Sequence, residues 1–124
     1  MNRRAMALAL LLAWAPVAPA RAVAVKSFSC EMAHTVDEKA VCRAPWLRRL
    51  DDIMAAQYVA LKAYLRRRRA LRPGWAADME RRLRDGQRDF VAARARCAAQ
   101  EACIGTLYEQ RIMALVRIWR ELLR

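Results

Sequence analysis

Four cysteines constrain this chain more than any other feature, because they fall into two short-range pairs. Cys30 and Cys42 are twelve residues apart, and Cys97 and Cys103 are six apart. An even number of cysteines in a short exported chain is typical of a disulfide framework, which supplements the modest hydrophobic core of a small domain. The cysteines therefore predict a small stapled domain that folds in an oxidising compartment.

The first 22 residues have the three parts of a secretory signal peptide. Two arginines near the start are followed by an apolar run over 5–15 and then by small residues in A-x-A spacing. We expect cleavage after Ala22, with Ala20 as the competing site. The apolar run is shorter than the roughly 20 residues that span a bilayer, and no cysteine lies near the cleavage point to carry a lipid. These features predict a periplasmic or secreted domain over 23–124, without a transmembrane segment.

From Trp46 onward the apolar residues recur every three or four positions, which is the spacing of one helix face, whereas 23–34 is expected to be extended or irregular. Thr35 and Glu38 form a capping-box pattern at the start of the first expected helix. The expected helices cover 36–43, 46–71, 75–97 and 101–124, with the break between the second and the third at Pro73-Gly74. We therefore predict one all-α domain, a small disulfide-stapled bundle of three long helices and one short N-terminal helix.

The charge of the chain is strongly basic and clustered. Three of the 24 basic residues lie within 1–22 and all 12 acidic residues lie beyond it, so residues 23–124 carry a formal charge of +9. Such a charge favours anionic partners such as lipid head groups or cell-wall glycans. The arginines that we expect to form one anion-binding end are Arg66, Arg67, Arg68, Arg69, Arg72, Arg81, Arg82 and Arg84. The alternative is that the abundance of arginine reflects base composition, because a GC-rich genome favours arginine codons whatever the function of the protein. Nucleic acid is not expected as a partner, since the chain carries an export signal and no recognised reader motif.

No residue pattern indicates catalysis, a metal or a cofactor. His34 is the only histidine, and the cysteines are expected to be bonded. Asp51 and Asp52 are adjacent, and neighbouring residues of a helix diverge by about 100°, so they do not face each other as an acid–base pair. We therefore predict that the protein is not an enzyme and binds no cofactor or metal.

Several short motifs occur together in one order along the chain. They are Ser27-Phe28-Ser29-Cys30, 36–42 with its E-K-x-x-C pattern, Leu50-Asp51 with Tyr58, 83–90 with Arg94 and Cys97, and Cys103 with Leu107-Tyr108-Glu109 and Arg111-Ile112. In this order they resemble the LprI-type lysozyme inhibitor N-terminal domain family, over about residues 27–120. The resemblance implies a small exported helical domain with Cys30–Cys42 and Cys97–Cys103 disulfides.

The resemblance also implies inhibition of lysozyme-type muramidases by occlusion of their surface. Animal lysozymes are strongly basic, and like charges slow encounter and cost affinity. A domain at +9 therefore has to offer such a partner a local acidic or apolar patch. The second hypothesis is an envelope-associated protein that docks its arginine-rich surface on anionic lipid or cell-wall glycan.

Four polar residues of these motifs lie beside apolar positions of the expected helices. They are Asp51, Gln87, Arg94 and Arg111. We expect a structural network in which Asp51 pairs with Arg94 or Arg111 across helices, and a functional surface is the alternative.

Overall fold

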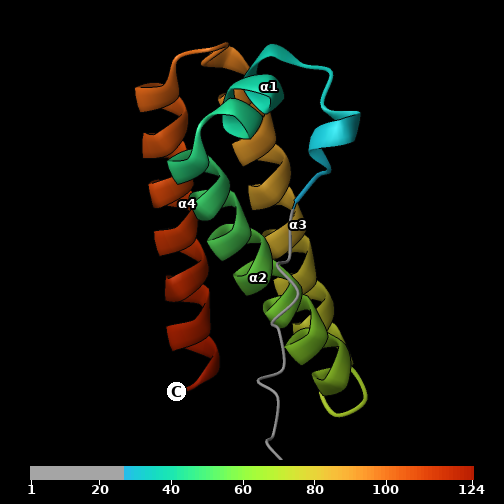
Figure 1. Cartoon of the computed structure of the whole chain (residues 1–124). Coiled ribbons are helices and arrows are strands. Elements are labelled where there is room, and N and C mark those ends of the chain that lie inside the picture. The colour runs from blue at the N-terminus through green and yellow to red at the C-terminus, as the bar shows by residue number, and fades with distance from the viewer. Residues whose placement is uncertain (1–26) are drawn as a thin grey trace, which may run out of the picture.

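The structure, a computed structural model, describes residues 27–124, so the predicted signal peptide and residues 23–26 lie outside the described residues. Residues 27–124 form one 3₁₀ turn and four α-helices (Figure 1). They are η1 (Cys30–Met32), α1 (Val36–Arg43), α2 (Pro45–Arg68), α3 (Pro73–Arg96) and α4 (Glu101–Leu122). The prediction of an all-α bundle with three long helices and one short one is thus confirmed.

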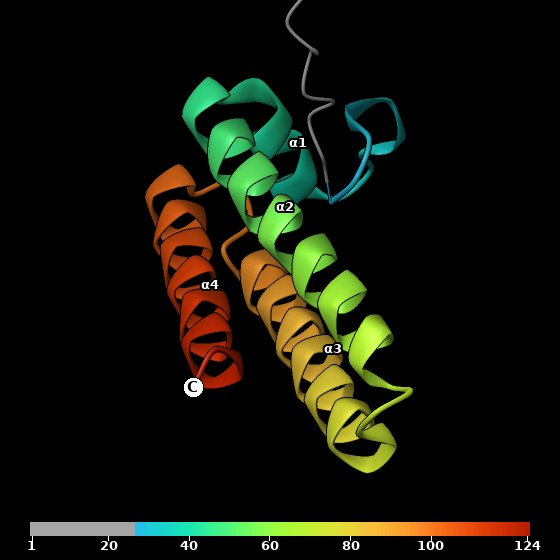
Figure 2. The ribbon, with the colours of Figure 1, turned by 90° about the horizontal axis from the view of Figure 1, so that it is seen from below.

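Each of the four helices packs against the other three, and α2 makes the most extensive contacts. Figures 1 and 2 show α1 at one end of the bundle and the α2–α3 connection at the opposite end. No helix within 27–124 is both long and apolar enough to cross a membrane. The bundle therefore has two distinct ends, one stapled around α1 and one formed by the turn between α2 and α3.

The turn between α2 and α3 lies earlier in the chain than the sequence predicts. Helix α2 ends at Arg68 and α3 begins at Pro73, so the helix break covers 69–72 and does not fall at Pro73-Gly74. Proline suits the first turn of a helix because it needs no N–H partner there. It also disfavours helical geometry in the residue before it, and Arg72 has φ −141° and ψ 70°. Pro73 therefore begins the third helix and ends the turn.

The core is built from the apolar faces of the three long helices and α1. Its largest fully buried side chains are Val41, Leu47, Met54, Leu61, Leu65, Leu83, Ile104, Tyr108 and Leu115. The Cys97–Cys103 disulfide closes the corner between α3 and α4, with the two Cα atoms 5.7 Å apart. Ala98 in this corner has φ 51°, a left-handed conformation that is uncommon for residues other than glycine. The short linker and the disulfide together turn the chain between two packed helices.

Candidate functional site

A buried ion pair joins α1 to α3. Arg94 Nε donates to Asp37 Oδ2 at 2.7 Å, and both side chains are 4% exposed. Burial by itself raises the pKa of Asp37, but hydrogen bonds from Arg94 and Thr35 outweigh burial and leave this pKa below its ordinary value. Burial likewise lowers the pKa of Arg94, but Tyr108 and Asp37 outweigh it and raise this pKa. Both partners therefore remain charged inside the protein.

The hydroxyl of Tyr108 extends this pair to α2. Arg94 Nη1 donates to Tyr108 Oη at 3.0 Å, and Tyr108 Oη donates to Asp51 Oδ1 at 2.9 Å. Burial raises the pKa of Tyr108 above its ordinary value, so the hydroxyl keeps its proton. The structure thus differs from the expected direct ion pair of Asp51 with Arg94 or Arg111, because within 27–124 the bonds of Asp51 go to Tyr108 and Ser27.

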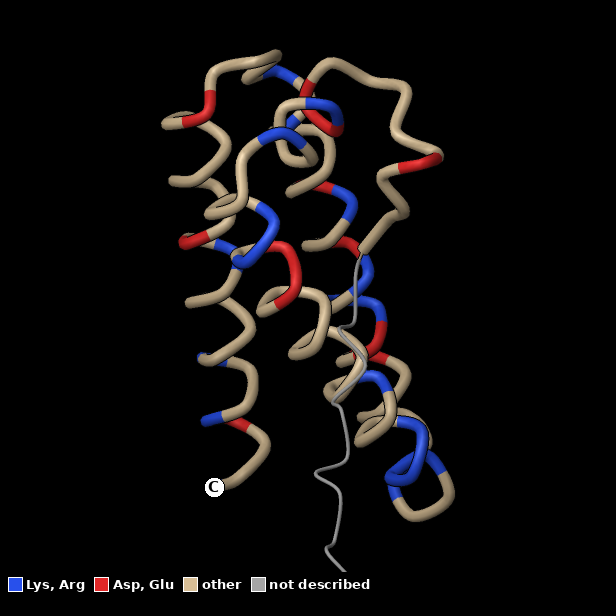
Figure 3. Tube along the Cα trace, viewed as in Figure 1, with Lys and Arg blue, Asp and Glu red and all other residues tan. Residues whose placement is uncertain are grey.

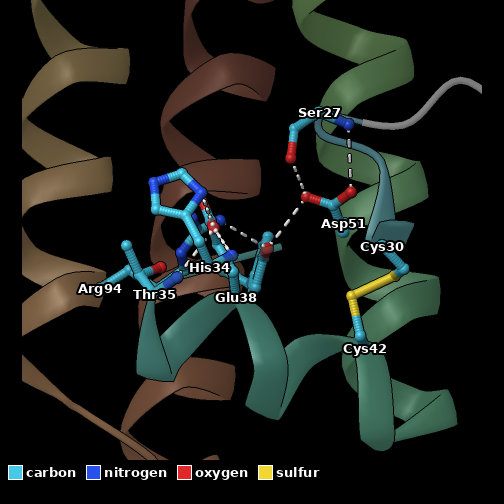
Figure 4. The surroundings of a disulfide bond; sticks show 9 residues. Ser27, Cys30, His34, Thr35, Glu38, Cys42, Asp51 and Arg94 are labelled. Carbon is cyan, nitrogen blue, oxygen red and sulfur yellow. Dashed lines mark hydrogen bonds and ion pairs between the residues drawn. A yellow bond between two sulfur atoms is a disulfide. The ribbon is translucent and has the colours of Figure 1, made fainter. Parts of the chain in front are cut away.

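Asp51 also holds the segment Ser27–Met32, which we call the strap, against the bundle. Its carboxylate accepts from the backbone N–H of Ser27 at 3.1 Å and from the Ser27 hydroxyl. At the next residue of the strap, the guanidinium of Arg94 lies 5.1 Å from the centre of the Phe28 ring. Figure 4 shows Ser27 beside Asp51 and the Cys30–Cys42 disulfide that ties the strap to α1. The network of α1, α2, α3 and α4 therefore also positions the strap.

Arg111 and Gln87 form a second cluster between α3 and α4. Arg111 Nε donates to Gln87 Oε1 at 3.0 Å, and Arg111 Nη2 donates to the Leu83 carbonyl at 2.9 Å. Burial lowers the pKa of Arg111. Gly86 makes room for this guanidinium, because a Cβ at position 86 would lie 2.6 Å from Arg111 Nη1. The four polar residues expected from the sequence thus fall into two clusters, Asp51 with Arg94 and Gln87 with Arg111.

Replacing Gly86 with alanine is expected to destabilise the bundle by about 1 kcal/mol. The Cβ displaces the Arg111 guanidinium, and losing its buried hydrogen bonds costs about 1–3 kcal/mol, whereas alanine gains only about 1 kcal/mol of helix propensity. Urea unfolding measures the difference. Gly74→Ala is the control, since nothing lies within 4 Å of a Cβ there. A Gly86→Ala protein as stable as the wild type would contradict this account of Arg111.

A mostly apolar groove lies between the strap, α2 and α3. It has a volume of about 380 Å³, and Val59 and Val91 on its walls are 50% and 44% exposed. Its charged lining residues are Glu38 and the buried, paired Arg94. Hydrogen bonds from the backbone N–H groups of His34 and Thr35 lower the pKa of Glu38, so this carboxylate is ionised at neutral pH. The groove is therefore an apolar surface with a negative charge at its edge.

The basic residues gather at the opposite end of the bundle, around the α2–α3 turn (Figure 3). The segment 62–84, which we call the basic tip, holds nine basic and two acidic residues, so it carries +7 of the +9 found in 23–124. Arg81 and Arg82 pair with Asp78 and Glu121. Arg68 and Arg72 lie over the rings of Tyr64 and Trp75, and Arg67 is exposed. The remaining three arginines of the predicted cluster line a cavity.

This cavity lies between α2 and α3 and has a volume of about 280 Å³. Its lining residues are Tyr58, Lys62, Arg66, Arg69, Glu80, Leu83 and Arg84. The Glu80 carboxylate pairs with Arg69, and Lys62 lies over the ring of Tyr58 at 5.6 Å. With four basic side chains and one carboxylate, the lining of the cavity carries a net positive charge.

Asp37 and Tyr108 are the site residues that sequence reasoning missed. Asp37 suits the first turn of the expected helix 36–43, and Tyr108 lies on the apolar face of the expected helix 101–124, so the sequence alone placed neither in a polar network. Both nevertheless belong to the motifs that carry the resemblance, and this was the available signal. No group of three or more histidine, cysteine, aspartate or glutamate residues in 27–124 is arranged to hold a metal ion.

Searches against protein-family models, curated proteins and solved structures find no match for this chain. The resemblance to the lysozyme-inhibitor family therefore rests on the sequence motifs, and the structure adds the geometry of two surfaces. These are the groove beside the strap and the cavity in the basic tip.

Proposed function

We propose that this chain is an exported binding module of the lysozyme-inhibitor type, which acts by covering the surface of a muramidase. The proposal rests on the motifs of the resemblance and on the uneven distribution of charge. Outside the basic tip, residues 23–61 and 85–124 together carry a formal charge of only +2. The apolar groove with the ionised Glu38 at its edge is the local patch that a basic partner requires.

The test is lysis of cell-wall suspensions by several lysozyme types, with and without purified protein lacking the signal peptide. We expect dose-dependent loss of lysis for at least one type. Val59→Arg should weaken inhibition about tenfold or more, because a positive charge in the contact region repels a basic partner. Met113→Arg is the matched control, since Met113 is similarly exposed on α4.

Three results of this assay are informative. Inhibition that Val59→Arg weakens and Met113→Arg leaves unchanged supports the groove as the contact surface. Equal effects of the two substitutions would exclude the groove, and no inhibition of any type at micromolar protein would exclude the muramidase as partner.

A second candidate function is supported by the cavity in the basic tip. In this proposal the protein docks its arginine-rich end on anionic lipid or cell-wall glycan, because arginine forks bind phosphate and carboxylate groups well. Co-sedimentation with anionic vesicles and with cell-wall fragments tests it. Binding should be lost at about 0.3 M salt, where exposed charges are screened over a few ångströms, whereas muramidase inhibition through the apolar groove should persist.

A further inference from the structure

The apex of the basic tip carries an exposed apolar side chain. Leu71 is 73% exposed and lies in the turn between the two helices, two residues after Arg69 and directly before Arg72. The turn is well defined, because the backbone N–H groups of Leu71 and Arg72 both donate to the Arg68 carbonyl, at 3.0 and 2.9 Å. An exposed leucine alone needs no explanation, but this one projects from the most basic part of the chain.

The cavity beside this turn has the chemistry of a phosphate site. Arg66 and Arg84 approach it from α2 and α3, and within 27–124 neither forms an ion pair. Guanidinium groups bind phosphate oxygens with two parallel hydrogen bonds. Glu80 neutralises Arg69 and leaves the two free arginines and Lys62 for a ligand.

Two aromatic residues complete the tip. Trp75 and Tyr64 are partly buried, and Arg72 and Arg68 lie over their rings. Tryptophan and tyrosine are enriched where proteins meet the head-group region of a membrane, because one side of each ring is apolar and the other is polar. Basic side chains close to an anionic leaflet add attraction in the same place.

We infer that the basic tip docks on an anionic phospholipid surface, with a lipid phosphate in the Arg66–Arg84 cavity and Leu71 in the interfacial layer. This inference rests on the second candidate function and narrows its ligand to lipid. A cell-wall glycan also offers anionic groups, but it offers no apolar layer for Leu71. The leucine at the apex and the arginines around it therefore favour a membrane over a cell-wall glycan.

The first experiment measures co-sedimentation with phosphatidylcholine vesicles, with and without phosphatidylglycerol. We expect binding only when phosphatidylglycerol is present. The double substitution Arg66→Gln and Arg84→Gln should weaken binding about tenfold or more, since each basic residue at the surface contributes to attachment. The control is the double substitution Arg117→Gln and Arg120→Gln, which removes the same charge from exposed positions of α4. It should weaken binding to the vesicles much less. Equal losses in the two double variants would overturn the phosphate site.

The second experiment measures insertion. Leu71→Trp is expected to place an indole that brominated lipids quench strongly, and Leu123→Trp is the control at a similarly exposed position near the C-terminus. The signal of the wild-type protein is subtracted from both, because Trp75 of the basic tip is present in each variant. Equal quenching of the two tryptophans in the bound state would overturn insertion of the turn.

The outcomes also separate this inference from the proposal on which it rests. Binding to cell-wall fragments without binding to phosphatidylglycerol vesicles would refute the lipid ligand and leave anionic docking in place. Absence of binding to both the vesicles and the cell-wall fragments would refute the lipid ligand and anionic docking together.

Discussion

Replacing Asp37 with asparagine is expected to lower the free energy of unfolding by about 3–5 kcal/mol, because removing one partner of a buried ion pair leaves the other charge uncompensated. Arg94 is 4% exposed, so its guanidinium cannot turn to water without disturbing Tyr108 and Phe28. Urea unfolding at neutral pH measures the loss. Asp78→Asn is the control, because Asp78 is exposed and its pair with Arg81 lies at the surface, where such pairs contribute about 0–1 kcal/mol.

The same ion pair predicts how stability depends on pH. The pKa of Asp37 is lower in the folded protein than in the unfolded chain, so between the two pKa values the unfolded state binds more protons. The contribution of the Asp37–Arg94 pair to the free energy of unfolding is therefore complete above about pH 4, the ordinary pKa range of an aspartate. This contribution is lost as the pH falls through the pKa that Asp37 has in the folded protein. The stability difference between wild type and Asp37→Asn should shrink below this pH. A difference that stays constant down to strong acid would contradict an ionised Asp37.

The bundle itself was predictable because its helices are specified locally. Apolar residues at spacings of three and four mark each buried face. Pro45 marks the start of α2, whereas Pro73, which was expected in the break, begins α3. The end of α2 was less predictable, since Arg69, Ala70 and Leu71 in the turn are good helix formers and continue the helical composition of α2. Arg72 leaves helical geometry because of the proline that follows it, so the turn lies before Pro73.

The two candidate surfaces differ in how far the sequence could predict them. The basic tip is visible in the sequence, because its arginines lie within 23 positions of one another. The groove is not visible, because it joins Phe28, Val59 and Val91 from three segments. The bond of Asp51 to Ser27, which spans 24 positions, likewise depends on how the chain folds back.

Removal of the Cys30–Cys42 disulfide is expected to affect the strap more than the rest of the bundle. Replacing both cysteines with serine is expected to cost about 2–3 kcal/mol, since the crosslink restricts the unfolded chain over a short loop. In the folded state the strap is then held by Asp51 and by Phe28 against Arg94. Because the strap then has no covalent link to α1, hydrogen exchange should accelerate at the amides of Met32 and Ala33, which donate to the carbonyls of Ser29 and Cys30.

The matched variant replaces Cys97 and Cys103 with serine. Its crosslink spans six positions in place of twelve, so the expected loss of stability is similar or slightly smaller, but exchange in the strap should remain slow. Urea unfolding and amide exchange measured on both variants distinguish the two roles. If the strap stays protected without the Cys30–Cys42 bond, the Asp51 and Arg94 contacts alone hold it, and the groove wall formed by Phe28 does not depend on the disulfide. If the strap exchanges freely, the disulfide maintains that wall, and muramidase inhibition through the groove should fall in the same variant.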